Sequence, residues 1–435
     1  MYNLISFTGI FILMAFAWIL STNRRIINWR VIFWGTTLQL MLALFIFVVP
    51  AGSQIFLMVN DGVIKVLESS TAGIRFLFGR LALPPGTSNE AGEESIGFIL
   101  AIQALPTIIF FASLMGLLYF IGVMPWLIRV FSKAFTRLMR ISGAESLSVS
   151  SNIFVGIEAN LTVLPYLNNM TRSELCTILA AGMSTTASSV LALYVFILKP
   201  TFPTIAGHLV SASILSAIGA IVMSKLIMPE TEKPETLGID VKPHYEKEST
   251  IIEAIINGAN EGVKMVIGIM ALLLAFLGLV ALIDFFFKGI GLNINKLLDI
   301  HVDWSLESLM GYVFYPFTLL IGVPLSDAFE ISKIIGERVI LTEVKSYQDL
   351  ATLLSSDILK EPRSAILAAY ALNGFAHVAS LAIFVGGTAA LVPKRTKDLS
   401  IVGLRALLAA TLASLMTAAV AGVFFNKGSI FLLGR

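Results

Sequence analysis

The sequence of 435 residues contains little cysteine, little histidine and few charged residues. The single cysteine, Cys176, excludes an intramolecular disulfide. Four histidines are scattered along the chain and form no local zinc-binding motif. Charged residues make up 13% of the chain, about half of the roughly 25% found in soluble domains, and the formal net charge is +2. The composition therefore argues against a structural metal site and against nucleic acid as a partner.

Hydrophobic residues account for 57% of the chain and gather in long runs. A helix needs roughly 20 apolar residues to cross a bilayer. We predict eight membrane-spanning helices, at residues 2–20, 31–49, 98–119, 173–198, 205–228, 263–287, 363–392 and 401–425. The first run lacks a preceding basic stretch and a following small-residue cleavage site, so we expect a retained helix and not a signal peptide. The predicted fold class is an all-α polytopic membrane protein.

Basic residues in short loops indicate the cytoplasmic side of a membrane protein. Such residues follow the first and the seventh predicted span: Arg24, Arg25, Arg30, Lys394, Arg395 and Lys397. Segment 229–249, rich in Pro, Lys and Glu, follows the fifth span and has the composition of a solvated linker. These segments should all lie inside. With eight crossings, both termini are then expected outside.

Residues 126–140, between the third and fourth spans, have the pattern of a basic amphipathic helix. Arg129, Lys133, Arg137 and Arg140 share one helical face, opposite an apolar side that includes Trp126. We expect this helix to lie in the cytoplasmic membrane interface. The alternative is an ordinary helix with a solvated face.

Two segments are too polar for ordinary spans and too apolar for loops. Residues 142–160 contain Gly, Ser and Asn where a spanning helix would contain Leu, and residues 326–354 form the second such segment. Because unpaired backbone cannot face lipid, we expect each to be a re-entrant helical hairpin whose broken tip lines a cavity. Each precedes a long helix that small polar residues interrupt, at 183–189 and at 373–380.

This repeated order of elements predicts an inverted repeat, with a binding site near the membrane midplane and the hairpins entering from opposite faces. We expect the chain to be divided into four parts. Residues 1–96 hold the N-terminal spans and an extracellular connecting segment, and residues 97–229 the first transport repeat with its interfacial helix. Residues 230–306 hold a cytoplasmic linker and a scaffold span, and residues 307–435 the second transport repeat.

Glu158 and Glu343 are the most informative residues of these segments. A carboxylate at membrane depth costs about 3 kcal/mol even on insertion scales, so each needs a cation, a partner or solute hydroxyls. The alternative is a structural acid that caps a hairpin helix or pairs with Arg338 or Lys345. For Glu145 and Glu337, elsewhere in the two segments, the structural role is the favoured interpretation.

Neutral oxygens in the same regions are suited to a desolvated sodium ion. Asn152 and the hydroxyl run 184–186 offer such oxygens beside backbone carbonyls of unwound helix. The alternative is that these hydroxyls bond to their own helix or to a neighbouring one. His377 fits a base-reading, proton-carrying or packing role, and its spacing does not rank the three.

From residue 103 to the last span, the sequence resembles the concentrative nucleoside transporter family. The resemblance rests on blocks at 103–111 (QALPTIIFF), 142–147 (SGAESL), 152–156 (NIFVG) and 165–167 (PYL). It implies eight transmembrane helices with two re-entrant hairpins, a homotrimer in the cytoplasmic (inner) membrane, and a sodium- or proton-coupled nucleoside symporter. It implies no enzymatic activity and no cofactor other than the coupling ion.

The resemblance also assigns site residues. The implied substrate contacts lie at the two hairpin tips and in the second broken helix: Gly156, Ile157, Glu158, Thr342, Glu343, Phe375, His377 and Ser380. The implied sodium ligands are Asn152, Val155, Thr185 and Thr186, with Val155 and Thr186 acting through backbone carbonyls. This residue match favours sodium over protons.

Departures from the family pattern concern the substrate site. Gly156-Ile157-Glu158 stands where the family has Gly-Gln-Thr-Glu, so the amide that reads the base is missing. Thr342 replaces the first residue of the Asn-Glu-Phe motif, Val344 replaces its last, and His377 stands in place of a pocket Asn. We therefore expect an altered nucleoside preference, because polar groups left unpaired in such a site discriminate strongly between solutes.

Other functions remain as alternatives to sodium-coupled nucleoside import. One is proton-coupled transport of a modified nucleoside or another hydroxyl-rich solute. An intramembrane enzyme would need a nucleophile with its base or a metal cluster, and the sequence has neither a Gly-x-Ser-x-Gly nor a His-Glu-x-x-His motif. A channel would show continuous pore-lining polarity instead of two hairpins.

Overall fold

The computed structural model describes residues 1–89, 92–244, 248–299 and 301–426, and these residues form helices and no β-strand. The α-helices are α1 (Tyr2–Ile19), α2 (Trp29–Phe47), α3 (Pro50–Phe78), α4 (Thr107–Phe120), α5 (Val123–Met139), α6 (Gly143–Asn152), α7 (Arg172–Ser184), α8 (Ser188–Leu198), α9 (Ile205–Ile227), α10 (Ile251–Leu298), α11 (Leu306–Leu320), α12 (Ala328–Ile340), α13 (Glu343–Ser355), α14 (Pro362–Ala371), α15 (Val378–Leu391) and α16 (Thr396–Phe424). Short 3-10 or π-helical segments are η1 (Gly79–Ala82), η2 (Leu100–Ala104), η3 (Ile157–Val163), η4 (Leu167–Asn169) and η5 (Pro393–Arg395).

Seven helical stretches of the described chain are long and apolar enough to cross a membrane, and each overlaps a predicted span. One of them, Arg172–Leu198, consists of α7 and α8 with a break between them. The remaining predicted span, the seventh at residues 363–392, is present as two shorter helices, α14 and α15, separated at residues 372–377. Both breaks fall where small polar residues predicted an interruption. The predicted all-α polytopic fold is confirmed.

Helix α3 was not predicted, because its polar residues break the apolar run that identifies a span. Asn60, Asp61, Lys65 and Glu68 recur among its apolar residues. Pro50 favours the start of the helix in its first turn, and Gly79, with φ +53°, follows its end. The segment expected to connect the second and third spans therefore contains a 29-residue helix.

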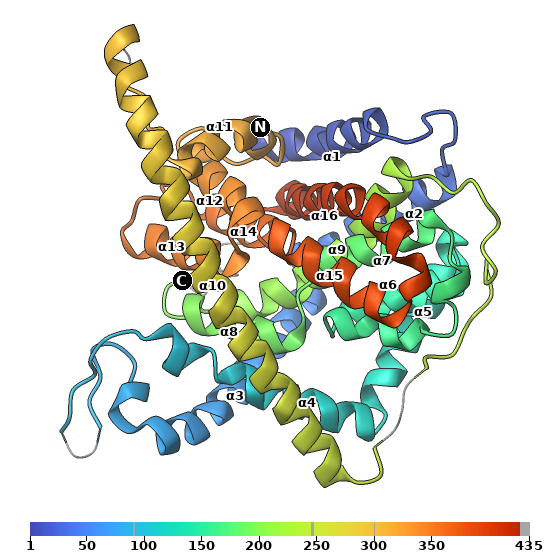
Figure 1. Ribbon diagram of the computed structural model, residues 1–435, viewed down its shortest axis with the longest axis horizontal. Helices are drawn as coiled ribbons and strands as arrows, with labels where there is room; N and C mark the ends of the chain where they lie inside the picture. Colours follow the sequence, from blue (N-terminus) through green and yellow to red (C-terminus); the bar gives the residue numbers. More distant parts are fainter. Residues whose placement is uncertain (90–91, 245–247, 300, 427–435) are drawn as a thin grey trace.

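Helix α10 is much longer than the span predicted within it. Its 48 residues extend roughly 70 Å, more than twice the thickness of a bilayer core. In Figure 1 it crosses the molecule from one end to the other and packs along α4. Glycine permits this close approach: a Cβ added to Gly258 would lie 2.6 Å from the Ala112 carbonyl oxygen, and one added to Gly116 would lie 2.6 Å from that of Ala254.

Helix α5 presents the basic face that the sequence predicted. Arg129, Lys133, Arg137 and Arg140 are all exposed. Trp126, predicted opposite the cations, is 63% exposed. It lies seven residues before Lys133, two helical turns away, and so belongs to the basic face itself. The buried side includes Met124, Ile128 and Met139, and through it the helix packs on the protein.

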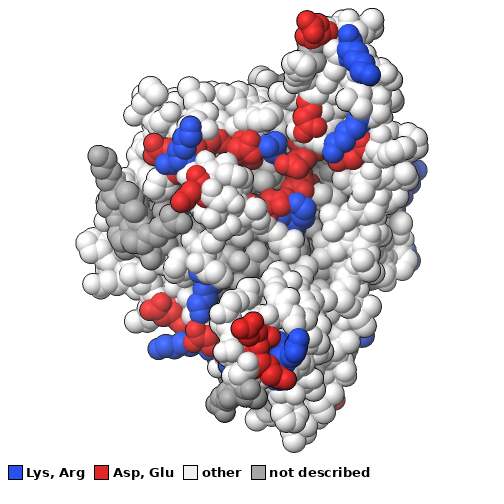
Figure 2. All heavy atoms as spheres, turned by 90° about the vertical axis from the view of Figure 1, so that its left-hand side faces the viewer, with Lys and Arg blue, Asp and Glu red and all other residues white. Residues whose placement is uncertain are grey.

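The surface is largely uncharged, as contact with lipid requires. On the face shown in Figure 2, acidic and basic side chains are interspersed in a few groups with wide uncharged areas around them. Several ion pairs of the structure join neighbours on one helix, for example Lys333 with Glu330 at 2.7 Å and Lys288 with Asp284 at 3.7 Å. Such pairs reduce the net charge of each group but contribute little stability.

The largely buried helices α7, α9 and α16 pack against one another in the centre of the molecule, and α14 joins them (Figure 1). The first hairpin, α6 followed by η3, is tied to this centre by a buried ion pair. Lys225 Nζ of α9 lies 2.7 Å from Glu145 Oε1 of α6 and donates to Ser173 Oγ at 3.0 Å. A buried ion pair tolerates the loss of neither partner, so it fixes how the hairpin docks. Glu145 thus has the structural surroundings that the sequence favoured.

The two broken helices meet at their breaks. Asn373, between α14 and α15, donates through Nδ2 to the Ser184 carbonyl at 2.9 Å and to Ser216 Oγ at 3.2 Å. Its Oδ1 accepts from the Thr186 hydroxyl at 3.0 Å, and that hydroxyl accepts from the Gly374 N–H at 3.1 Å. Polar groups released where each helix unwinds are therefore paired with the other break, as a membrane interior requires.

Gly374 is the position where this crossing should be most sensitive to substitution. Its φ is +85°, and a Cβ would lie 2.3 Å from the Ser184 carbonyl carbon. We expect Gly374→Ala to lower the melting temperature of the detergent-solubilised protein by about 5 °C or more. Gly386→Ala is the matched control, because Gly386 lies in α15 with nothing within 4 Å of its added Cβ. Equal melting temperatures of the two variants would contradict the tight crossing.

Candidate functional site

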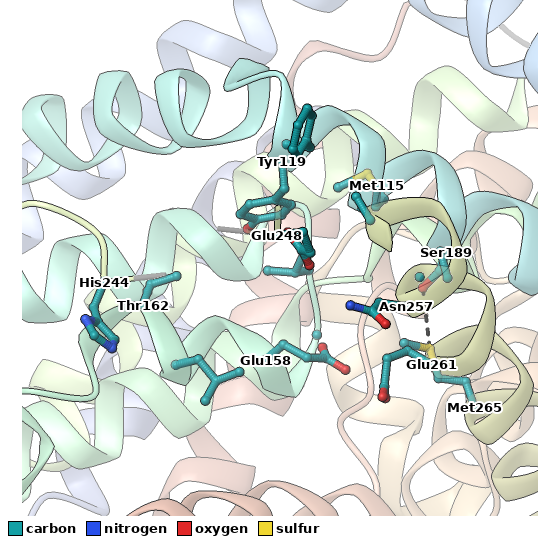
Figure 3. A pocket seen from close by; sticks show the side chains of 18 of the residues that line it. Met115, Tyr119, Glu158, Thr162, Ser189, His244, Glu248, Asn257, Glu261 and Met265 are labelled. Atoms are coloured by element: carbon teal, nitrogen blue, oxygen red, sulfur yellow. Dashed lines mark hydrogen bonds between the residues drawn. The ribbon is translucent and has the colours of Figure 1, made fainter. Parts of the chain in front are cut away.

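Two adjoining cavities lie between the hairpins, the broken helices and α10. The larger, about 450 Å³, is bounded by α4, η3 and α10 (Figure 3). The smaller, about 240 Å³, is bounded by α8, α10, α15 and the tips of both hairpins. Gly156, Glu158 and Met265 line both. A solute in the smaller cavity would therefore contact residues that also face the larger one.

Nearly all of the implied substrate residues line the smaller cavity: Gly156, Glu158, Thr342, Glu343, Phe375, His377 and Ser380. They come from the two halves of the chain, which are 184 residues apart at their closest, from Glu158 to Thr342. Only the docking of both hairpins brings them together. The side chain of Ile157, at the start of η3, lies outside the described part of the structure.

The local sequence explains why both hairpins end in a turn at this depth. In the first, the serine-rich helix α6 ends at Asn152, and an irregular turn at residues 153–156 leads into η3. In the second, Leu341 has a non-helical conformation, and the extended Thr342 precedes the first turn of α13. Glu343 is therefore the first residue of a helix, where the aligned peptide dipoles favour a carboxylate.

Glu343 is almost fully buried and has two side-chain partners. The Tyr194 hydroxyl donates to Oε1 at 2.6 Å, and His377 Nε2 lies 2.9 Å from Oε2. Neither of the structural partners considered from the sequence fills this role. Arg338 donates to the Ala371 and Asn373 carbonyls, and Lys345 pairs with other carboxylates of its hairpin.

Glu158 lies where the two cavities join. In Figure 3 its carboxylate points toward Asn257 and Glu261, which α10 contributes to the larger cavity. Glu261 itself pairs with Lys264 at 2.6 Å. Glu158 takes part in no ion pair with any described residue, so its oxygens remain able to accept hydrogen bonds from a solute.

The other polar residues of the smaller cavity differ in whether their side chains are free to form hydrogen bonds with a solute. The buried Thr342 hydroxyl has no hydrogen-bond partner among the described residues. The Ser380 hydroxyl donates to the carbonyls of Phe375 and His377 and accepts from the His377 N–H at 3.3 Å. Thr342 is therefore available to a ligand, whereas Ser380 is engaged within the protein. Phe375 contributes an apolar surface.

The implied sodium ligands lie where the first hairpin tip meets the first broken helix. Asn152 donates through Nδ2 to the Ser148 carbonyl at 3.0 Å, while its buried Oδ1 has no partner among the described residues. The Thr185 hydroxyl donates to the Ala181 carbonyl at 2.8 Å and keeps its lone pairs. Both groups thus retain an oxygen that fits a cation.

Backbone contacts hold this tip against the break between α7 and α8. The Ser188 N–H donates to the Phe154 carbonyl at 2.9 Å, and Val155 follows in the same turn. Ser213 bridges the two segments, since it accepts from the Thr186 N–H at 3.4 Å and donates to the Ile153 carbonyl at 3.1 Å. The Thr186 hydroxyl donates a hydrogen bond to Asn373, so the group that Thr186 can offer to an ion is its backbone carbonyl.

The donor set is suited to an alkali cation and not to a transition metal. The described residues contain no group of three or more His, Cys, Asp or Glu side chains able to hold a metal ion. Neutral amide, hydroxyl and carbonyl oxygens are the groups that coordinate sodium at broken membrane helices.

Sequence reasoning missed the contribution of Tyr194 and of α10. Tyr194 is a single tyrosine inside an apolar run, and its fully buried hydroxyl reaches Glu343 from behind the cavity. The only available signal was that a buried hydroxyl needs a partner. Asn257 and Met265 of α10 belong to a stretch that the sequence analysis treated as linker and scaffold.

Three family models match successive parts of the chain. Residues 8–81 match the N-terminus of the Na+ dependent nucleoside transporters, and residues 208–422 match their C-terminus. Residues 101–201 match a model named Gate and described as "Nucleoside recognition".

Individual proteins match over almost the whole chain. Nucleoside permease NupC of Helicobacter pylori is 36% identical, with 98% of each chain covered. Sodium/nucleoside cotransporter 1 of Mus musculus is 33% identical over 97% of this chain, which spans 64% of that longer protein. A solved structure of CNTnw in an inward-facing substrate-bound state is 34% identical and superposes with a TM-score of 0.86, with 98% of each chain covered.

Proposed function

Because the chain belongs to the concentrative nucleoside transporter family, we propose that it is a cation-coupled symporter that imports nucleosides or nucleoside-like solutes across the cytoplasmic membrane. Members of this family are transporters and not enzymes. One observation carries the proposal: Glu158 and Glu343, from two different hairpins, line one cavity between two broken helices. Paired broken helices with a polar midplane site are typical of secondary transporters.

In this proposal the carboxylates bind the sugar and apolar surfaces bind the base. Each buried carboxylate accepts hydroxyl hydrogen bonds, which offset the cost of its burial. Phe375 and the aliphatic residues of α10, such as Ile269 and Leu273, provide apolar walls. Because the family amide that reads the base is missing beside Glu158, the base is held mainly by these walls.

We propose sodium as the coupling ion, bound by Asn152, Val155, Thr185 and Thr186. A cation at this position would fix the turn at residues 153–156, which continues directly into Glu158. Sodium would then order the part of the hairpin that holds the solute, and the solute would order the part that holds sodium. The two affinities should rise together, as reciprocal coupling requires.

Proton coupling is the second candidate, and the contact between His377 and Glu343 favours it. An imidazole beside a carboxylate in the solute cavity could carry a proton across with the solute. The two candidates differ in whether uptake needs sodium.

The proposed assembly is a homotrimer with both termini outside. Its support is the family membership and the large exposed apolar surface of α10, which includes Leu274, Leu279 and Phe285. Lipid and neighbouring subunits are the surroundings in which such a surface is stable.

The sodium site predicts a specific change in ion dependence. We expect Asn152→Ala or Thr185→Val to raise the sodium concentration for half-maximal uptake by roughly tenfold, equivalent to about 1.4 kcal/mol. Thr411→Val is the matched control, because that hydroxyl also donates to its own helix, at 3.0 Å, but lies in α16 away from the site. Uptake that persists without sodium and collapses with a protonophore would instead establish proton coupling.

The substrate site predicts a ligand-dependent loss of affinity. Glu343→Gln keeps the shape but removes the charge, so we expect ribonucleoside binding to weaken by roughly ten- to a hundredfold. A nucleoside analogue without ribose hydroxyls should be affected much less. Glu337→Gln serves as control, because Glu337 is buried in the same hairpin but faces Lys345 outside this cavity. Equal losses for both ligands would assign Glu343 to coupling or to hairpin structure.

The proposed orientation can be tested by thiol labelling of intact cells. The native Cys176 is fully buried and should not react with a membrane-impermeant maleimide. Cysteines placed at Arg140 and Lys233 should react only after permeabilisation, since α5 and the linker are expected inside. A cysteine at the exposed Ser88 should react directly. The reverse pattern would invert the assigned topology.

A further inference from the structure

His377 engages both of its ring nitrogens within the protein. It occupies the position before α15, where Nδ1 accepts from the Ser380 N–H at 3.2 Å and caps the helix. In a neutral imidazole one nitrogen accepts and the other donates. Because Nδ1 is the acceptor here, Nε2 carries the proton, and it faces Glu343 Oε2 at 2.9 Å. The helix cap thus sets the tautomer that donates to Glu343.

The second oxygen of Glu343 is held from another direction. The Tyr194 hydroxyl donates to Oε1 at 2.6 Å, and its ring packs on Tyr347 with the centroids 4.5 Å apart. Tyr194 and Tyr347 are fully buried, so this anchor is rigid. Oε1 thus accepts a hydrogen bond from Tyr194, Oε2 lies 2.9 Å from the His377 Nε2 atom, and each oxygen keeps lone-pair capacity for a solute hydroxyl.

We propose that His377 is a positioning residue: together with Tyr194 it fixes Glu343 as a paired acceptor for two neighbouring solute hydroxyls, and it offers no hydrogen bond of its own to the solute. This inference rests on the proposed function and adds to it a chemical requirement on the solute. A vicinal diol presents two donors side by side and matches two oxygens held in one plane.

The remaining polar groups of the smaller cavity extend this requirement. Ser380 and His377 are engaged within the protein, so the side chains left for a solute are the carboxylates of Glu158 and Glu343 and the Thr342 hydroxyl. Of these, only Thr342 can donate when the carboxylates are ionised. The cavity therefore selects solutes by their donors, namely a vicinal diol and an N–H or O–H group directed at Glu158.

The test is a double-mutant cycle on purified full-length protein in sodium, with binding of uridine and of 2′,3′-dideoxyuridine measured by calorimetry. His377→Leu should weaken uridine binding by roughly tenfold, because the freed carboxylate loses its alignment. The same substitution should change the affinity for 2′,3′-dideoxyuridine by less than about twofold. In a Glu343→Gln background, His377→Leu should weaken uridine binding no further, because His377 acts through Glu343.

Conservative variants separate positioning from helix capping. His377→Asn, which can still cap α15 and donate an N–H, should restore much of the uridine affinity lost in His377→Leu. Tyr194→Phe removes the other anchor without touching α15, and it should also weaken uridine selectively. If the His377→Leu variant does not fold, the Tyr194→Phe variant provides the test. Glu337→Gln is the unaffected control.

Opposite results have distinct meanings. Equal losses for both ligands, or additive losses in the Glu343→Gln background, would show that His377 acts on the fold or on the solute directly, and would overturn the inference alone. If the wild-type protein bound neither uridine nor other nucleosides, the proposed function would fall together with the inference.

Discussion

The interaction on which the architecture depends is the mutual pairing of two broken helices through Asn373. A helix that unwinds inside a membrane leaves polar backbone groups without partners, and lipid supplies none. Here the Ser184 carbonyl of one break is paired by the Asn373 amide of the other, and the Thr186 hydroxyl joins both. The breaks are thus stable only together. The first hairpin tip then docks against one break, and the second tip lies beside the other.

Much of the fold could be predicted because a bilayer imposes a simple rule on sequence. Long apolar runs identified the spans, and polar interruptions identified the hairpins and the broken helices. Helix α3 escaped because its polar residues recur along its length, and the true extent of α10 escaped because its ends are less apolar than its middle. Trp126 was placed on the wrong side of α5, although its spacing of seven residues from Lys133 puts it on the exposed basic face.

The site was predictable in its residues but not in its hydrogen bonds. Burial cost singled out Glu158 and Glu343, and the family resemblance supplied the other polar lining residues of the smaller cavity together with Gly156 and Phe375. The resemblance made His377 and Ser380 solute contacts, but the geometry engages their polar groups within the protein. The bonds between His377 and Ser380 are local to the start of α15, where they form a capping box. The contacts of His377 and Tyr194 with Glu343 instead join elements whose relative positions follow from tertiary packing. Sequence spacing carries no information about such pairings.

The carboxylates that line the two adjoining cavities also give these cavities a negative electrostatic potential. Glu158 and Glu343 face the smaller cavity and Glu248 and Glu261 the larger, while no Lys or Arg of the described chain lines either. Low-dielectric walls concentrate such a negative field. In the proposed function a neutral nucleoside would cross this field without a charge penalty, whereas the phosphate of a nucleotide would be repelled by the carboxylates. The acids proposed to accept sugar hydroxyls would then also select against the phosphorylated forms of the solute.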